Sequence, residues 1–199
     1  FNLNDDRENN LKIDGADGNK VEFWMKKAAF DPDATKKEVI LDVFVTGTTS
    51  ASSDYGRFTI EMSATTRQES PFYITYMSGT TGILSESIGS SLTTASVADD
   101  TWHHYAFRLA NTGTTDIIAD LFIDGVHNHR LVTGSTVDYV SGALVATIGA
   151  LVAPPSGNLF TTAVNSSGVS GPNKGWGKLS ASIDEFRYWK TFRTSKKIQ

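Results

Sequence analysis

The strongest indication of the fold is the stretch Gly177-Lys-Leu-Ser-Ala-Ser-Ile-Asp-Glu-Phe-Arg-Tyr-Trp-Lys-Thr-Phe-Arg-Thr-Ser-Lys-Lys-Ile198. Apolar and polar residues alternate from Leu179 to Ile183, as they do in a strand with one buried face. Phe186 then follows three residues after Ile183, and a regular strand cannot keep both side chains on one face. We therefore predict a β-bulge, or a change of the buried face, near Asp184-Glu185.

Similar segments recur along the rest of the chain, separated by turns rich in Gly, Ser, Thr, Asn and Asp. This pattern predicts an all-β sandwich with a capped helical turn at Thr194-Ser195 and little other helix. The cleanest alternation runs from Arg57 to Ser63, and we expect its polar face to contact water. Asp124-Gly125 predicts a type I′ hairpin turn, since both residues accept positive φ. The other predicted strands lie at 21–25, 39–45, 72–77, 102–109, 119–123 and 144–151.

Composition narrows the classes of partner. The chain has 199 residues, a net charge of −4 and no cysteine, which excludes disulfides and thiolate metal sites. A mildly acidic chain has no general attraction to nucleic acid or anionic membranes, and no apolar run is long enough to span a bilayer. We expect one domain over residues 1–199. Because Phe1 stands in place of Met, we expect a processed chain or an excised piece of a longer one.

Four short motifs follow one another along the chain: Ile13-Asp-Gly with Val21-Glu-Phe-Trp-Met-Lys26, then Thr101-Trp-His-His-Tyr-Ala106, Leu121-Phe-Ile-Asp-Gly125 and Ser182-Ile-Asp-Glu-Phe-Arg-Tyr-Trp189. In this order and spacing they resemble the laminin-G-like, concanavalin A-like jelly-roll family, over about residues 11–198. The ending from Asp184 to Thr194 looks most like variants in structural proteins of tailed bacteriophages.

The resemblance implies a two-sheet antiparallel jelly-roll β-sandwich, with ligands at the concave face or its rim. It also implies a binding or spacer module inside a larger extracellular protein, and core or sheet-edge roles for Trp24, Trp102 and Trp189. The fold does not settle function, because lectins, hydrolases and structural domains share it.

The sequence has no convincing set of catalytic side chains, so we expect no enzyme activity and assign no catalytic residue. Laminarinase-type hydrolases of this superfold carry the spacing Glu-x-Asp-x-x-Glu, which is absent from the sequence. Asp184 and Glu185 are neighbours and would point to opposite faces of a regular strand, whereas retaining hydrolysis needs two facing carboxyl groups. His127 and His129 could form one arm of a zinc site, but a third ligand is lacking, which favours a surface hairpin.

Calcium is the better metal hypothesis, because carboxylate and carbonyl oxygens suit it. In related jelly rolls a structural calcium can tie the first strand to the last. By that resemblance Asp184 would supply one carboxylate, with Asp14 or Asp17 from the first loop. The alternative is that Asp184 accepts a backbone hydrogen bond at the bulge.

Sugar binding needs aromatic faces flanked by amides and carboxylates. Trp176 lies between two glycines at the end of the long loop 154–175 and is the first candidate. Tyr73 and the loop residues Asn158 and Asn173 are further candidates.

The sequence therefore predicts a non-catalytic adhesive or structural module of an extracellular or virion-surface assembly. Its expected partners are glycans or neighbouring structural subunits, with homo-oligomerisation open and no required cofactor. A dedicated carbohydrate-binding lectin is the alternative, and a glycoside hydrolase is a more distant one.

Overall fold

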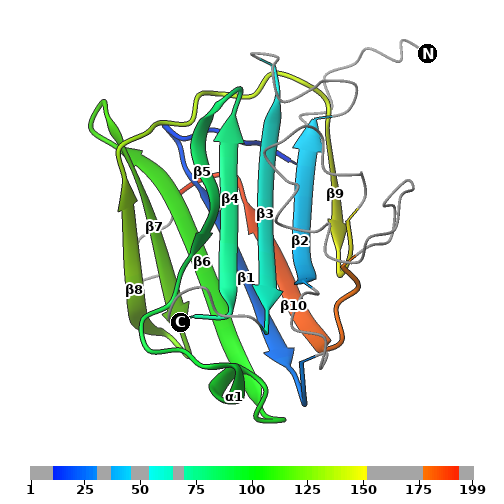
Figure 1. Ribbon diagram of the computed structural model, residues 1–199. Helices are drawn as coiled ribbons and strands as arrows, with labels where there is room; N and C mark the ends of the chain where they lie inside the picture. The colour runs from blue at the N-terminus through cyan, green and yellow to red at the C-terminus, as the bar shows by residue number, and fades with distance from the viewer. Residues whose placement is uncertain (1–10, 31–36, 46–53, 65–69, 152–176, 193–199) are drawn as a thin grey trace, which may run out of the picture.

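In the computed structural model, segments with alternating apolar and polar residues form two five-stranded antiparallel sheets that face each other (Figure 1). The structure describes residues 11–30, 37–45, 54–64, 70–151 and 177–192. The first sheet has the order β10-β1-β6-β7-β8, and the second has the order β5-β4-β3-β2-β9. The elements are β1 (Asn19–Lys26), β2 (Lys37–Val45), β3 (Gly56–Ser63), β4 (Phe72–Ser78), β5 (Thr81–Ser87), α1 (Thr94–Val97), β6 (Trp102–Thr112), β7 (Asp116–Ile123), β8 (Val126–Thr133), β9 (Leu144–Ile148) and β10 (Ser182–Trp189). This is the predicted all-β jelly-roll sandwich.

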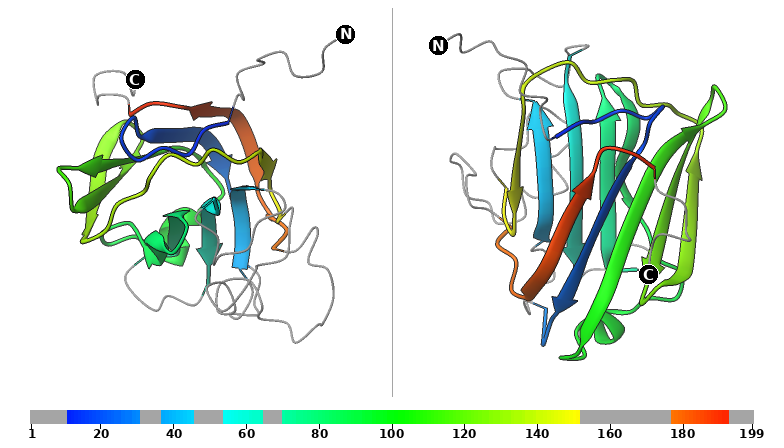
Figure 2. Two further views of the ribbon diagram at one scale, coloured as in Figure 1. Left: turned by 90° about the horizontal axis from the view of Figure 1, so that it is seen from above. Right: turned by 180° about the vertical axis from the view of Figure 1, so that it is seen from behind.

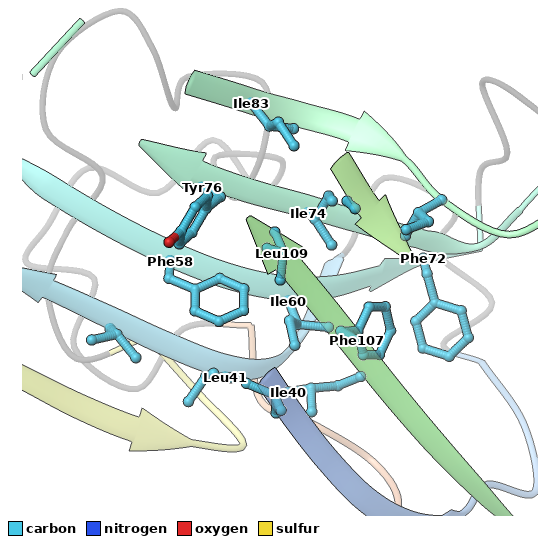
Figure 3. Packing of buried hydrophobic residues seen from close by; sticks show 14 of the residues in the cluster. Ile40, Leu41, Phe58, Ile60, Phe72, Ile74, Tyr76, Ile83, Phe107 and Leu109 are labelled. Atoms are coloured by element: carbon cyan, nitrogen blue, oxygen red, sulfur yellow. The ribbon is translucent and has the colours of Figure 1, made fainter. Parts of the chain in front are cut away.

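The core lies between the two sheets and is made of the apolar positions that alternate along each strand (Figure 3). Val21, Phe23 and Met25 of β1 are at most 1% exposed, as their spacing predicts. Phe72 of β4 and Phe107 of β6 meet across the sandwich with their ring centroids 5.5 Å apart. Burial of this apolar surface is the main force that holds the sheets together.

The predicted bulge in β10 is present. Glu22 and Trp24 of β1 pair with Arg187 and Asp184, so β10 has one extra residue at this point. Glu185 takes up the irregularity with a φ of 48°. Because of this extra residue, Ile183, Phe186 and Tyr188 all pack against the core.

A second bulge separates the two histidines of β8. Leu121 pairs with His129 and Phe122 pairs with His127, which leaves Asn128 without a place in the regular register. His127 Nε2 lies 3.1 Å from Asp120, while His129 Nδ1 accepts the N–H of Gly89. Since the two imidazoles serve different partners, they do not form the zinc arm considered above.

The outer face of the second sheet differs from the sequence prediction. Arg57, Thr59, Glu61 and Ser63 were expected to contact water, but each is at most 6% exposed. Arg57 donates from Nε and Nη2 to the two carboxylate oxygens of Asp42, at 2.9 and 2.8 Å. Alternation correctly places these residues on one face, but it does not tell whether that face is covered.

Two of the three tryptophans differ from their expected core or sheet-edge roles. Trp24 and Trp102 are 37% and 45% exposed, so neither belongs to the core. Trp24 belongs to β1, an inner strand of the first sheet, and therefore does not lie at a sheet edge. Trp189 does lie on the edge strand β10, where it is half-buried. The described residues contain no helix of the length and hydropathy that a membrane span requires.

Candidate functional site

The sequence-predicted ligand residues are only partly within the described ranges. Tyr73 lies on β4 in the second sheet and is 5% exposed, with the Lys37 ammonium 4.8 Å from its ring centroid. A buried ring already covered by a cation does not offer a face for a sugar in this conformation. Trp176, Asn158 and Asn173 lie outside the described residues, so their roles stay predictions.

The three predicted calcium ligands are not brought together. The Lys12 ammonium lies 2.8 Å from Asp14 and 2.5 Å from Asp17, so one cation already pairs with both carboxylates. Asp184 pairs with Trp24, whereas the other end of β10 is nearest to the first loop, where Phe192 N–H donates to the Asp17 carbonyl. The structure thus does not bring the three carboxylates together, and the calcium link between them stays a prediction.

Asp184 instead follows the alternative reading. One of its carboxylate oxygens accepts the backbone N–H of Glu185 at 2.7 Å, which fixes the bulge. Within the described ranges, no group of three His, Asp or Glu side chains could hold a metal ion. Calcium binding at another place stays a prediction.

The first sheet has an outer face that points away from the second sheet (Figure 2). Exposed aromatic side chains lie on this face. Trp24 of β1 pairs with His104 of β6, and their ring centroids lie 5.4 Å apart. Trp102 pairs with Lys26, two residues further along each strand, and therefore lies on the same face as Trp24 and His104. We call Trp24, Trp102 and His104 the tryptophan platform.

His104 brings hydrogen-bonding capacity to the platform. Burial lowers its pKa below the usual range, although the nearby Glu22 carboxylate opposes that change. The imidazole is therefore neutral at pH 7 and can both donate and accept a hydrogen bond. Its backbone N–H donates to the Asp124 carboxylate at 2.8 Å, which ties the platform to the β7–β8 turn.

That turn is itself held by His103. Its Nδ1 lies 2.7 Å from Asp124 and its Nε2 lies 3.0 Å from Asp99, so one imidazole joins two loops at the end of the platform. Hydrogen bonds to Asp99 and Asp124 raise the pKa of His103. Asp124 and Gly125 have φ of 50° and 79°, which confirms the predicted type I′ turn.

Glu22 lies on the same face of β1, two residues before Trp24. It ion-pairs with the buried Lys20 and accepts the indole N–H of Trp189 at 3.1 Å. Burial opposes ionisation of Glu22, but the hydrogen bonds from Lys20 and Trp189 outweigh burial and lower its pKa. The platform is thus bordered by a carboxylate that is charged at neutral pH.

Asp120 of β7 lies between Arg108 and Arg130, its pairing partners on the two neighbouring strands. It is fully buried and accepts hydrogen bonds from Arg108 of β6 and from Arg130 of β8. We call Arg108, Asp120, His127 and Arg130 the arginine cluster. The outer face of the first sheet therefore combines an aromatic end with a charged end.

Sequence reasoning missed this face, although a signal was present. Lys20, Glu22 and Trp24 alternate with the core residues of β1, and Trp102 and His104 do so on β6. Period two assigns them to the outer face. The family resemblance, which gives such tryptophans a structural role, obscured that assignment.

Comparisons with known proteins give only distant likenesses. No family model and no curated protein matches the chain. A heptameric SAP-like pentraxin from Limulus polyphemus is 10% identical with a TM-score of 0.48, over 94% of this chain and 70% of the pentraxin. The alginate lyase Aly36B is 17% identical with a TM-score of 0.36, over 69% of this chain and 61% of the lyase.

Scytalido-glutamic peptidase is 10% identical with a TM-score of 0.35, over 93% of this chain and 82% of the peptidase. All of these structures are below 25% identical and below a TM-score of 0.5, so no ligand or activity is transferred from them. The resemblance to laminin-G-like modules consequently rests on the four sequence motifs.

Proposed function

We propose that this protein is a non-catalytic carbohydrate-binding module that belongs to a larger extracellular or virion-surface assembly. The observation that carries the proposal is Trp24, which is 37% exposed in the middle of a sheet face and is flanked by His104. The attribution to a virion rests on the resemblance of the C-terminal motif alone.

The physical argument starts from the needs of a pyranose ring. Its C–H face needs an aromatic surface, and its hydroxyls need nearby donors and acceptors. Trp24 and Trp102 supply the aromatic surface, and the neutral His104 supplies a donor and an acceptor. These groups project from neighbouring strands, which hold them rigidly.

A docking module that binds a neighbouring protein subunit is the second candidate. Exposed tryptophans are also typical of protein interfaces, and Val126 and Val132 of β8 are 70% and 54% exposed. An interface would cover the platform together with the edge strand β8, whereas a sugar would need the platform alone. A second copy of the chain is one such partner.

A glycan array tests the proposal, run once with calcium and once with a chelator. We expect saturable binding to a narrow class of sugars, reduced about tenfold or more in Trp24→Ala because a stacked aromatic ring dominates such contacts. Tyr139→Ala is the matched control, since Tyr139 is 61% exposed but lies outside the sheet. Its binding should equal that of the wild type.

Other results of this experiment would favour a different binding site or a different function. Loss of binding in Trp176→Ala with full binding in Trp24→Ala would move the site to the long loop and overturn the platform. Loss on chelation would support the calcium hypothesis. If no sugar binds under either condition, the docking module becomes the better interpretation.

A further inference from the structure

The arginine cluster has more positive than negative charge. Asp120 accepts from Arg108 Nε and Nη2 at 3.2 and 2.7 Å, and from Arg130 Nε and Nη2 at 2.7 and 3.0 Å. His127 Nε2 lies 3.1 Å from the same carboxylate. One carboxylate thus serves two guanidinium groups, which remain charged at every physiological pH.

The Asp120 carboxylate does not lose its negative charge by protonation. Burial opposes ionisation of Asp120, but hydrogen bonds from Arg130, Arg108 and His127 outweigh burial and lower its pKa. The cluster therefore holds at least one net positive charge, although the chain as a whole has a net charge of −4. In the described part of the chain, Asp120 is the one carboxylate that pairs with Arg130.

The excess charge faces solvent from a fixed position. The side chains of Arg130 and His127 are 48% and 46% exposed, while Asp120 lies beneath them. Arg108 is held in place because its guanidinium carbon lies 5.1 Å from the Phe122 ring centroid and 4.2 Å from that of Phe192. Arg130 uses Nε and Nη2 for Asp120, so the donors it can offer to the oxygens of an outside anion are the N–H groups of Nη1.

We propose that the arginine cluster binds the anionic group of an acidic glycan, a carboxylate or a sulfate, whose sugar rings extend to the tryptophan platform. This inference rests on the proposed function. His104 and Arg108 lie on the same face of β6, four residues or about 13 Å apart, so an extended oligosaccharide can reach both. The ligand class is thus an acidic, rather than a neutral, polysaccharide.

Calorimetry tests the proposal with a uronate oligosaccharide, its carboxyl-reduced neutral counterpart and a sulfated neutral oligosaccharide. We expect the wild type to bind one of the acidic ligands about tenfold more tightly than the neutral one, and Arg130→Gln to lose that preference. The acidic ligand that binds more tightly than the neutral one shows whether the cluster prefers a carboxylate or a sulfate. Inorganic sulfate, followed by NMR at the Arg108 Nε–H, probes the cluster without any sugar, and this probe survives in Arg130→Gln.

Arg187→Gln is the matched control. Arg187 is an equally exposed arginine on the outer face of the first sheet, but it pairs with two carboxylates, Glu185 at 2.8 Å and Glu22 at 3.7 Å. Its replacement changes the net charge by the same amount outside the cluster. We expect Arg187→Gln to keep the preference for the acidic ligand.

Failure of this inference can be told from failure of the proposed function. Equal affinity for acidic and neutral ligands, both weakened by Trp24→Ala, would overturn the arginine cluster and leave the platform standing. A sulfate response that Arg130→Gln abolishes, with no effect of Trp24→Ala on any ligand, would support the cluster and overturn the platform. No response to sulfate and no binding of the acidic oligosaccharides would overturn the inference.

Discussion

Glu61 is a buried acid whose charge is poorly compensated. It is 1% exposed on the outer face of the second sheet, and Lys37 is 3.6 Å away. One of its carboxylate oxygens has no hydrogen-bond partner. Burial raises the pKa of Glu61 to about 7, with the Lys37 and Arg57 charges acting in the opposite direction. The folded state therefore prefers the protonated acid.

The sign of the pH dependence follows from that preference. Between pH 4.5, the ordinary pKa of this group, and about 7, the folded state holds a proton that the unfolded state has lost. Stability attributable to Glu61 consequently falls as the pH rises through this range. We predict that Glu61→Gln, which cannot ionise, raises the free energy of unfolding at pH 8 by about 1–3 kcal/mol.

Urea denaturation at pH 4 and pH 8 checks this prediction. At pH 4 the variant and the wild type should be nearly equal, because the acid is then protonated in both states. Glu185→Gln is the control, since it removes an exposed carboxylate and should leave the difference between the two pH values unchanged. A Glu61→Gln variant that is less stable at pH 8 would contradict the assignment.

The bulge of β10 depends on one residue with an unfavourable backbone conformation. Glu185 has a φ of 48°, which costs a side-chain-bearing residue about 1–2 kcal/mol and is worst for β-branched residues. We predict that Glu185→Val lowers the free energy of unfolding by at least about 1 kcal/mol relative to Glu185→Gly. Both variants lose the ion pair with Arg187, so chemical denaturation of the two compares the backbone alone.

Equal stability of these two variants would mean that β10 can shift its register. Ile183 and Phe186 would then no longer share the core face, which near-ultraviolet circular dichroism would detect.

The elements differ in how far the sequence predicts them. The faces of β1, β3, β4 and β6 follow from period two, because each strand buries one face against the core. The strand β5 is not predicted, since Thr81-Gly-Ile-Leu-Ser-Glu-Ser87 lacks a clear alternation and Ser85 has positive φ. The bulge near Asn128 leaves no sequence signal either, and the histidines were therefore placed on one face.

The candidate site was less predictable than the fold. Asp120 and Arg130 lie ten residues apart, and their pairing depends on the register of two strands, which no local pattern fixes. Period two places Trp24 on the outer face of its strand, but exposure of that face depends on what covers the sheet. Cross-strand neighbours and coverage are properties of the tertiary structure.

On the scale of the whole molecule, a buried ion pair links the two sheets. Lys27 follows β1 and is 1% exposed, and its ammonium lies 2.7 and 2.8 Å from the two oxygens of Glu38 in β2. The backbone of Ser180, just before β10, completes the link by donating to Glu38 and accepting from Lys27. Three segments from both sheets thus share one buried charge pair.

Removing one partner of such a pair leaves the other charge buried and uncompensated. We predict that Lys27→Met lowers the free energy of unfolding by about 3–5 kcal/mol, and that Lys27→Met/Glu38→Met recovers much of that loss. Urea denaturation of the wild type, both single variants and the double variant gives the coupling energy. Because the link joins the sheets, fluorescence and far-ultraviolet circular dichroism should report one coincident transition in the wild type. Additive losses would show that the two charges act independently, and separate transitions in the wild type would show that the sheets unfold as separate units.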